Sequence, residues 1–185
     1  MDKPFRIAPL APPYPADVAE SLRKWMPPGA AVEPLALFRT LARHPALSER
    51  MRPLGALFLG RGSLSVRERE LVILRTCARA GAGYEWGVHA AAFAAAAGLD
   101  DAALSATRAA VPGAPLSEAD LALVAIVDEL HDSGTVSDAA WARLAGRFSD
   151  VERLELLALA GFYHLIAFVA NGARVEPEPW AVRWA

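Results

Sequence analysis

The sequence contains a single cysteine, Cys77, among its 185 residues. A lone cysteine excludes an intramolecular disulfide framework, and it excludes any mechanism that needs two cysteines of the same chain. Lysine is almost as scarce, since 17 of the 19 basic residues are arginine. The formal charge of −2 provides no basic field that would attract nucleic acid. We therefore expect neither a disulfide scaffold nor a nucleic-acid-binding protein.

Long hydrophobic runs and a secretion signal are also missing. No stretch reaches the roughly 18 consecutive apolar residues of a membrane span, and the first fifteen residues lack the apolar core of a signal peptide. These features predict a cytoplasmic protein without membrane contact. The hydrophobic content is nevertheless high, at 54%. Because a monomer of this size would expose part of that content, we expect a homo-oligomer such as a trimer or a hexamer.

Proline is absent between residues 54 and 111, whereas ten of the fourteen prolines lie in the first 53 residues. The middle of the chain can therefore form uninterrupted helix. No segment alternates apolar and polar residues with a period of two, which disfavours strands. We expect an extended arm over residues 1–15, followed by a single all-α domain over residues 16–180.

Serine residues mark several expected helix starts. Ser65, Ser117 and Ser149 are each followed three residues later by an acidic residue, which is the pattern of a capping box. Ser137 indicates a further start. The expected helices cover residues 18–26, 32–44, 65–80 and 84–97, a short segment from 100, and segments from 117, 137 and 149, the last ending near 171–172. A weak likeness between residues 66–74 and 151–159 suggests two related helical halves.

The stretch from Glu70 to His89 carries the residues best suited to chemistry. Glu85 and His89 are four residues apart on one predicted helix, so they share a face. Glu70 lies on the preceding predicted helix, and a turn at the intervening glycines would fold the second helix back on the first. Two carboxylates and an imidazole would then surround one pocket, with Tyr84 or Trp86 in its wall. Such neighbours can raise the pKa of a half-buried histidine into the range of a general acid.

This stretch resembles the carboxymuconolactone decarboxylase and alkyl hydroperoxidase D-like superfamily. Peroxidase members of the superfamily carry a glutamate, a Cys-x-x-Cys pair starting twelve residues later, and a histidine four residues after the second cysteine. Counted in the same way from Glu70, the two cysteine positions are occupied by Ala82 and Glu85, and the histidine position by His89. Both cysteines are therefore missing. The decarboxylase branch is similar instead in its tyrosine-glutamate-tryptophan-x-x-histidine string, which stands here as YEWGVH. The segments LFRTLARHPAL and GFYHLIAFVANGARVEPEP extend the likeness over roughly residues 35–180.

The resemblance implies an alkyl hydroperoxidase D-like helical bundle and a lyase that works without cofactor or metal. Its reaction would be acid/base decarboxylation or isomerisation of a small organic acid or lactone. His89 would carry the proton, and Glu70 and Glu85 would set its charge and orientation. Tyr84 and Trp86 would contact the substrate, and Arg75, which lies between Glu70 and Glu85 in the sequence, is the candidate for binding a substrate carboxylate.

Three other interpretations remain open for the same residues. A hydroperoxide reductase, of peroxiredoxin type, would need a reactive thiolate and a resolving thiol, whereas Cys77 lies on the apolar stripe of its predicted helix as a structural thiol. A metal centre could use two carboxylates and one histidine, but no second histidine stands at helical spacing. A non-catalytic helical oligomer would bind a small molecule, with Glu85 and His89 as an ordinary surface pair.

Three further histidines have structural interpretations. His44 is expected to end a helix before Pro45. His131 is expected at the carboxyl end of a helix or in the following loop, and His164 in the core.

Overall fold

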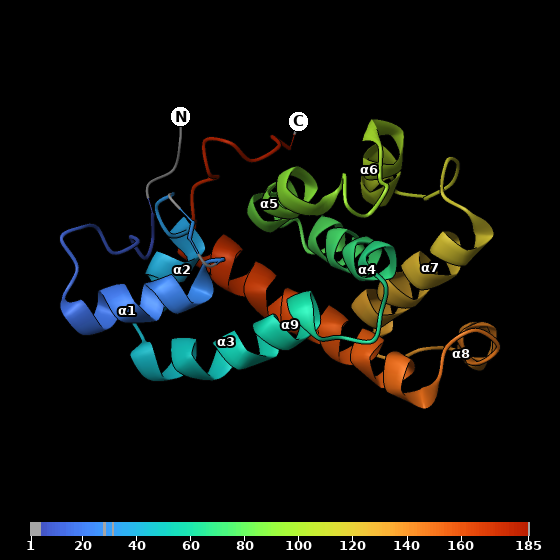
Figure 1. Ribbon diagram of the computed structural model, residues 1–185. Coiled ribbons are helices and arrows are strands. Elements are labelled where there is room, and N and C mark those ends of the chain that lie inside the picture. Colours follow the sequence, from blue (N-terminus) through green and yellow to red (C-terminus); the bar gives the residue numbers. More distant parts are fainter. Residues whose placement is uncertain (1–4, 28, 31, 185) are drawn as a thin grey trace.

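The computed structural model describes residues 5–27, 29–30 and 32–184 (Figure 1). Within this part of the chain the fold is all-α, as predicted, with nine helices and no strand. The helices are α1 (Ala16–Trp25), α2 (Ala36–Leu41), α3 (Pro45–Gly60), α4 (Val66–Arg79), α5 (Gly83–Phe93), α6 (Asp101–Arg108), α7 (Glu118–Ser133), α8 (Asp138–Ala145) and α9 (Asp150–Ala173).

The amino-terminal segment has no helix before α1 in its described residues, 5–15; residues 1–4 of the expected arm lie outside the described part. The backbone N–H of Arg6 donates to the carbonyl of Ala173 at 2.9 Å, and that of Leu10 donates to the carbonyl of Arg39 at 3.2 Å. The segment therefore lies against α2 and the carboxyl end of α9.

The central helix of the fold is α4, which packs against α5, α6, α7 and α9 (Figure 1). Every residue from Arg69 to Cys77 is buried, so this helix is enclosed on all sides. Three of these residues, Arg69, Glu70 and Arg75, have charged side chains. Because a buried charge is costly without a partner, each of them must be paired within the protein.

The capping boxes predicted at Ser65, Ser117 and Ser149 are all present, and Ser137 caps α8. At α4 the Ser65 hydroxyl accepts from the backbone of Glu68, whose carboxylate accepts from the backbone N–H of Ser65 at 2.9 Å. Two N–H groups that would lack partners are thereby satisfied. The serine pattern consequently predicted the starts of four helices correctly.

The turn between α4 and α5 is closed by Gly81, whose φ is +61°. Its N–H donates to the carbonyl of Ala78 at 3.1 Å, and the N–H of Ala82 donates to that of Cys77 at 2.8 Å. This pair of bonds is the Schellman motif, in which glycine takes a left-handed conformation at no steric cost. The chain reverses within three residues, and α5 comes to lie beside α4 (Figure 1).

The segment around α2 and α3 departs from the expectation. The helix predicted over residues 32–44 covers only Ala36–Leu41, and α3 was not predicted. His44 caps the start of α3, where its ring accepts from the N–H of Leu47 at 3.3 Å, instead of ending a helix before Pro45. Pro53 lies inside α3 and removes the bond to the carbonyl of Glu49. Since Glu49 is exposed, water can satisfy that carbonyl.

The carboxyl-terminal segment after α9 crosses over α5. The N–H of Val182 donates to the carbonyl of Gly87 at 3.1 Å. The buried Glu178 carboxylate accepts from the Tyr84 hydroxyl at 2.7 Å and from the N–H of Ala36 at 2.6 Å. Trp184 packs edge-on against Trp86, with ring centroids 5.5 Å apart. The segment thereby connects α5 to α2.

The longest helix, α9, is long and apolar enough to cross a membrane by length and composition alone. Half of its most apolar 18-residue stretch is buried within the protein, against α4, α5, α3 and α8. One side of α9 therefore belongs to the core of this fold.

Candidate active site

Glu70, Glu85 and His89 meet in the interior, as their spacing predicted. Glu70 Oε2 lies 2.7 Å from Nδ1 of His89, and Glu85 Oε1 lies 3.4 Å from Nε2 of the same ring. The two carboxylates thus flank the imidazole on its two nitrogens. Glu70 is fully buried, and His89 and Glu85 retain only 3% and 7% exposure.

Two residues that the sequence analysis missed complete this cluster. Tyr163 of α9 places its hydroxyl 3.1 Å from His89 Nε2. Arg69 donates from Nε to Glu70 Oε1 at 2.8 Å and from Nη1 to the carbonyl of Leu59 at 3.0 Å. The position of Arg69 next to Glu70 on a fully buried helix was the available signal for it. Tyr163 is distant in sequence, and only its place in the GFYHL segment pointed to it.

The pKa of His89 is raised to about 9. Burial alone would lower the pKa of the imidazole, but attraction to the Glu70 carboxylate and then to that of Glu85 outweighs it. At neutral pH the ring is therefore an imidazolium, which donates from Nδ1 to Glu70. The second N–H, on Nε2, points toward Tyr163 and Glu85.

Glu85 has one oxygen available for a ligand. Its Oε2 is buried and has no hydrogen-bond partner among the described residues. A buried acceptor without a partner is destabilising, so a donor group of a ligand would be favoured there.

The thiol and phenol near the cluster stay protonated. Burial raises the pKa of Cys77 well above its usual value, and the carboxylates of Glu85 and Glu70 raise it further. Burial and the same two carboxylates also raise the pKa of Tyr163. Cys77 is thus the buried, unreactive thiol that the sequence predicted, and Tyr163 can act only as a neutral donor or acceptor.

The predicted substrate-binding residues have other partners. Arg75 is bound to both carboxylate oxygens of Asp128, at 2.6 and 2.8 Å, and to two backbone carbonyls near α6. Trp86 donates to the Thr107 hydroxyl at 3.1 Å, and Tyr84 donates to Glu178. The structure does not bring the polar atoms of these three residues to His89.

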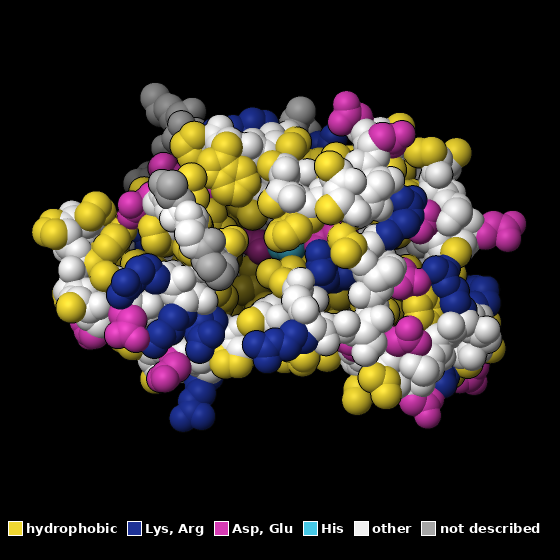
Figure 2. Space-filling view, viewed as in Figure 1, with side chains coloured by type: hydrophobic (Ala, Val, Ile, Leu, Met, Phe, Trp, Pro, Cys, Tyr) yellow, Lys and Arg dark blue, Asp and Glu magenta, His cyan; other side chains and the backbone are white. Residues whose placement is uncertain are grey.

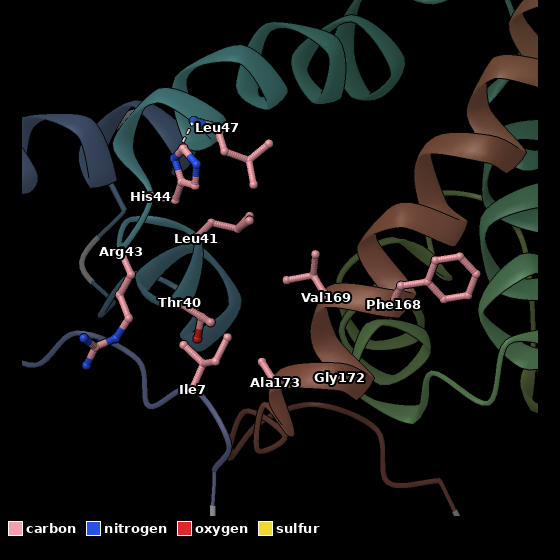
Figure 3. Close-up of a pocket in the computed structure, with 10 residues that line it drawn as sticks. All are labelled: Ile7, Thr40, Leu41, Arg43, His44, Leu47, Phe168, Val169, Gly172 and Ala173. Atoms are coloured by element: carbon pink, nitrogen blue, oxygen red, sulfur yellow. Dashed lines mark hydrogen bonds between the residues drawn. The ribbon is translucent and has the colours of Figure 1, made fainter.

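The surface over the middle of the fold is hollowed (Figure 2). Hydrophobic side chains make up most of the hollow, and small areas of histidine and acidic side chain are visible within it. A separate cavity of about 390 Å³ lies between α2, the start of α3 and the carboxyl end of α9 (Figure 3). Its walls are mainly apolar, with Leu41, Leu47 and Val169 among them. None of Glu70, Glu85 and His89 lines this cavity.

No group of three histidine, cysteine or acidic side chains is arranged to hold a metal ion within the described residues. In the cluster, Arg69 and His89 already bind the two oxygens of Glu70.

His131, in the last turn of α7 as expected, contacts His164 of α9 through ring nitrogens 2.9 Å apart. Burial lowers the pKa of His131, and the nearby Arg79 and His164 lower it further.

Comparison with known proteins shows which protein family this chain resembles. Residues 44–129 match the sequence profile of the carboxymuconolactone decarboxylase family. This match agrees with the resemblance that the sequence pattern predicted, and the matched segment contains Glu70, Glu85 and His89. No curated protein matches the sequence.

Solved structures share the fold at low sequence identity. An uncharacterised peroxidase-related protein from Silicibacter sp. TM1040 has a TM-score of 0.81 at 18% identity, with 97% of this chain and 96% of that one covered. A peroxidase-related protein from Ralstonia eutropha JMP134, with an alkylhydroperoxidase AhpD core, has a TM-score of 0.79 at 19% identity and 95% coverage of both chains. The debrominase Bmp8 has a TM-score of 0.76 at 14% identity, with 94% and 92% covered. These similarities establish an AhpD-like fold.

Proposed function

We propose that the protein is an acid/base enzyme that decarboxylates or isomerises a small organic acid or lactone, using its own side chains. The observation that carries this proposal is the placement of His89 between the carboxylates of Glu70 and Glu85, which keeps the buried imidazole charged at neutral pH. A charged imidazolium is a general acid ready to donate a proton.

In a decarboxylation, the carbon–carboxylate bond breaks and its electron pair is delocalised over the substrate as an enolate. His89 donates its Nε2 proton to the distant carbon of that system and becomes neutral, and a proton from water then restores it. Glu70 keeps the ring oriented through Nδ1. Proton transfer of this kind contributes about 10²–10⁴-fold, and stabilisation of the developing negative charge by the imidazolium and Arg69 supplies a further part.

In an isomerisation, the same groups act in sequence. Glu85 removes a proton from one carbon through its unpaired Oε2, and His89 returns a proton at the other end of the conjugated system. The proton held by Glu85 then passes to the neutral His89, which restores both groups for the next turnover. The carboxylate and the imidazolium lie on the same side of the cluster, so one substrate can contact both.

Hydroperoxide reduction and debromination, which the names of the structural neighbours suggest, have weaker support in this chain. The neighbours share less than 20% identity with it, so their similarity concerns the fold. The only thiol is Cys77, which is fully buried and has a raised pKa. Cys77 is therefore disfavoured as a thiolate nucleophile, and the two positions that carry cysteines in the peroxidase branch are Ala82 and Glu85 here.

The proposal can be tested with a panel of unsaturated lactone carboxylates and conjugated carboxylic acids. Carbon dioxide release reports decarboxylation, and deuterium incorporation from D₂O, followed by NMR, reports either reaction. We expect turnover to fall by about 10²-fold or more in His89→Gln and Glu85→Gln, because both variants keep size but lose the titrating group. His131→Gln is the matched control and should retain wild-type turnover.

Undiminished turnover in His89→Gln would refute the acid/base role. If panel members bound to the wild-type protein without reacting, the result would instead support a non-catalytic binding protein.

A further inference from the structure

The outer face of α9 carries an apolar stripe with the period of a coiled coil. Its residues recur at alternating intervals of three and four, which keeps them on one side of the helix. They are Val151, Leu154, Ala158, Gly161, Leu165, Phe168 and Gly172. All seven are exposed. The largest exposed fractions among the large side chains of the stripe are those of Leu154, at 69%, and Phe168, at 67%. We call this set the α9 stripe.

The composition of this face is unusual for a surface helix. Apart from Asp150 and Asn171 at its two ends, every exposed residue of α9 belongs to the stripe, and none of the seven is charged. A helix face in contact with water is normally charged or polar. The opposite face of α9 packs on α4 and carries Tyr163, so the stripe is not needed for the core of the subunit.

The stripe is complementary to itself when a second α9 is placed antiparallel on it. With Gly161 at the centre, Leu165 of one copy faces Ala158 of the other, and Gly172 faces Val151, so that a large side chain meets a small one in both pairs. Leu154 and Phe168 are seven residues on either side of Gly161, and they face each other as the two outer anchors. Gly161 itself has no neighbouring atom within 4 Å of an ideal Cβ, which leaves the crossing point open for close approach.

Charge complementarity favours the same orientation. Antiparallel helices place the amino end of each dipole beside the carboxyl end of the other. The exposed Asp150 at the start of α9 then lies near Arg174 of the second copy, which follows the end of its helix. In a parallel arrangement Asp150 would face Asp150, and the two Phe168 rings would compete for one position.

We propose that a second copy of this chain covers the α9 stripe, with the two α9 helices antiparallel and a two-fold axis at Gly161. Burial of four large apolar side chains from each copy drives the association, and the cavity beside Val169 and Gly172 lies at each end of the contact (Figure 3). A two-fold pair is the unit of a dimer or of a hexamer, and it does not by itself form a trimer. The pairing does not depend on the acid/base function.

The two-fold axis makes a position-specific test available. A cysteine at Gly161 would face the same cysteine of the second copy, so Gly161→Cys should form a disulfide-linked dimer on mild oxidation. Leu154→Cys chains alone should not form a disulfide-linked dimer. A mixture of Leu154→Cys and Phe168→Cys chains should form a disulfide-linked dimer that contains one chain of each variant. Ser105→Cys, exposed on α6, is the matched control and should stay uncrosslinked. Cys77 is buried and does not interfere.

Light scattering provides the second measurement. The wild-type chain of 19.7 kDa should form a particle of at least twice that mass at micromolar concentration. Leu154→Glu should weaken association by at least about tenfold, and Leu154→Glu combined with Phe168→Lys should restore it, because the two positions face each other.

Three outcomes would overturn the proposal. The first is a stable 19.7 kDa particle for the wild-type chain. The second is an oligomer that Leu154→Glu leaves intact while Gly161→Cys fails to cross-link. The third is stripe-dependent binding of the monomer to phosphatidylcholine vesicles, which would assign the stripe to a lipid surface.

Discussion

Arg69 and Arg75 lie within two turns of α4, but their environments give them different roles. Arg75 is 1% exposed, and all of its contacts join α4 to α6 and α7. Arg69 contacts Glu70, the residue that orients His89. Arg75 was predicted as the anion-binding residue, but the helical period turns it toward Asp128, away from the cluster. Of these two arginines, Arg69 is therefore the one that contacts the His89 cluster, through Glu70.

The raised pKa of His89 predicts how stability depends on pH. Between the ordinary value of 6.5 and about 9, the folded protein binds a proton at His89 that the unfolded chain releases. Stability from this group is fully present below pH 6.5 and is lost as pH rises toward 9. The difference between the two pKa values corresponds to about 3 kcal/mol.

Urea unfolding of the wild type at pH 6, 7.5 and 9 should show this decline, and His89→Gln should lack it. Direct titration of the His89 ring by NMR gives the pKa independently. A His89 pKa at or below 6.5 would remove the basis for both the pH dependence and the general-acid role.

Cys77 predicts the redox behaviour of the protein. Because the thiol is fully buried and its pKa is raised, it should react with a disulfide reagent such as Ellman's reagent only after unfolding by urea. Hydroperoxide consumption should be negligible and unchanged in Cys77→Ser. Rapid labelling of the native protein, or peroxide turnover that disappears in Cys77→Ser, would contradict this account.

At the scale of helices, the sequence was most informative where a local hydrogen bond sets a boundary. Capping boxes at Ser65, Ser117 and Ser149 involve residues three positions apart, so a single chain segment contains the whole signal. The helix α3 was missed because Pro53 normally interrupts a helix, and its tolerance here depends on the exposure of the preceding turn. The end of α5 at Phe93, earlier than predicted, depends on a turn among alanines that has no strong sequence signal.

Gly87 of α5 lies directly against the carboxyl-terminal segment. A Cβ at this residue would lie 2.3 Å from the carbonyl oxygen of Val182. Gly87→Ala should therefore displace the terminal segment and cost about 1–3 kcal/mol of stability, as overpacking does. The contact between Trp184 and Trp86 should be lost, which tryptophan fluorescence can follow.

Gly60→Ala is the matched comparison, since no atom lies within 4 Å of its ideal Cβ. It should be neutral or stabilising by up to about 1 kcal/mol. Equal unfolding midpoints for Gly87→Ala and the wild type would show that the terminal segment does not constrain α5.

At the scale of the whole molecule, the candidate site was predictable only in part. Glu70, Glu85 and His89 lie on consecutive helices, and one short turn brings them together, so spacing along the chain was sufficient. Tyr163 reaches this cluster from a distant part of the sequence, and Glu178 reaches Tyr84 at the start of α5. Their positions depend on how α9 and the terminal segment pack over α5, which local patterns do not specify.

The interior cluster combines two formally positive side chains, Arg69 and His89, with two formally negative ones, Glu70 and Glu85. Their formal charges add to zero, so the group as a whole leaves no net charge in the protein interior. Replacement of one member by a neutral residue leaves one charge uncompensated there, which is far more costly than loss of a balanced pair. These four positions therefore constitute a neutral unit in which replacement of an oppositely charged pair costs less stability than replacement of a single member, and this constrains the redesign of the site for another chemistry.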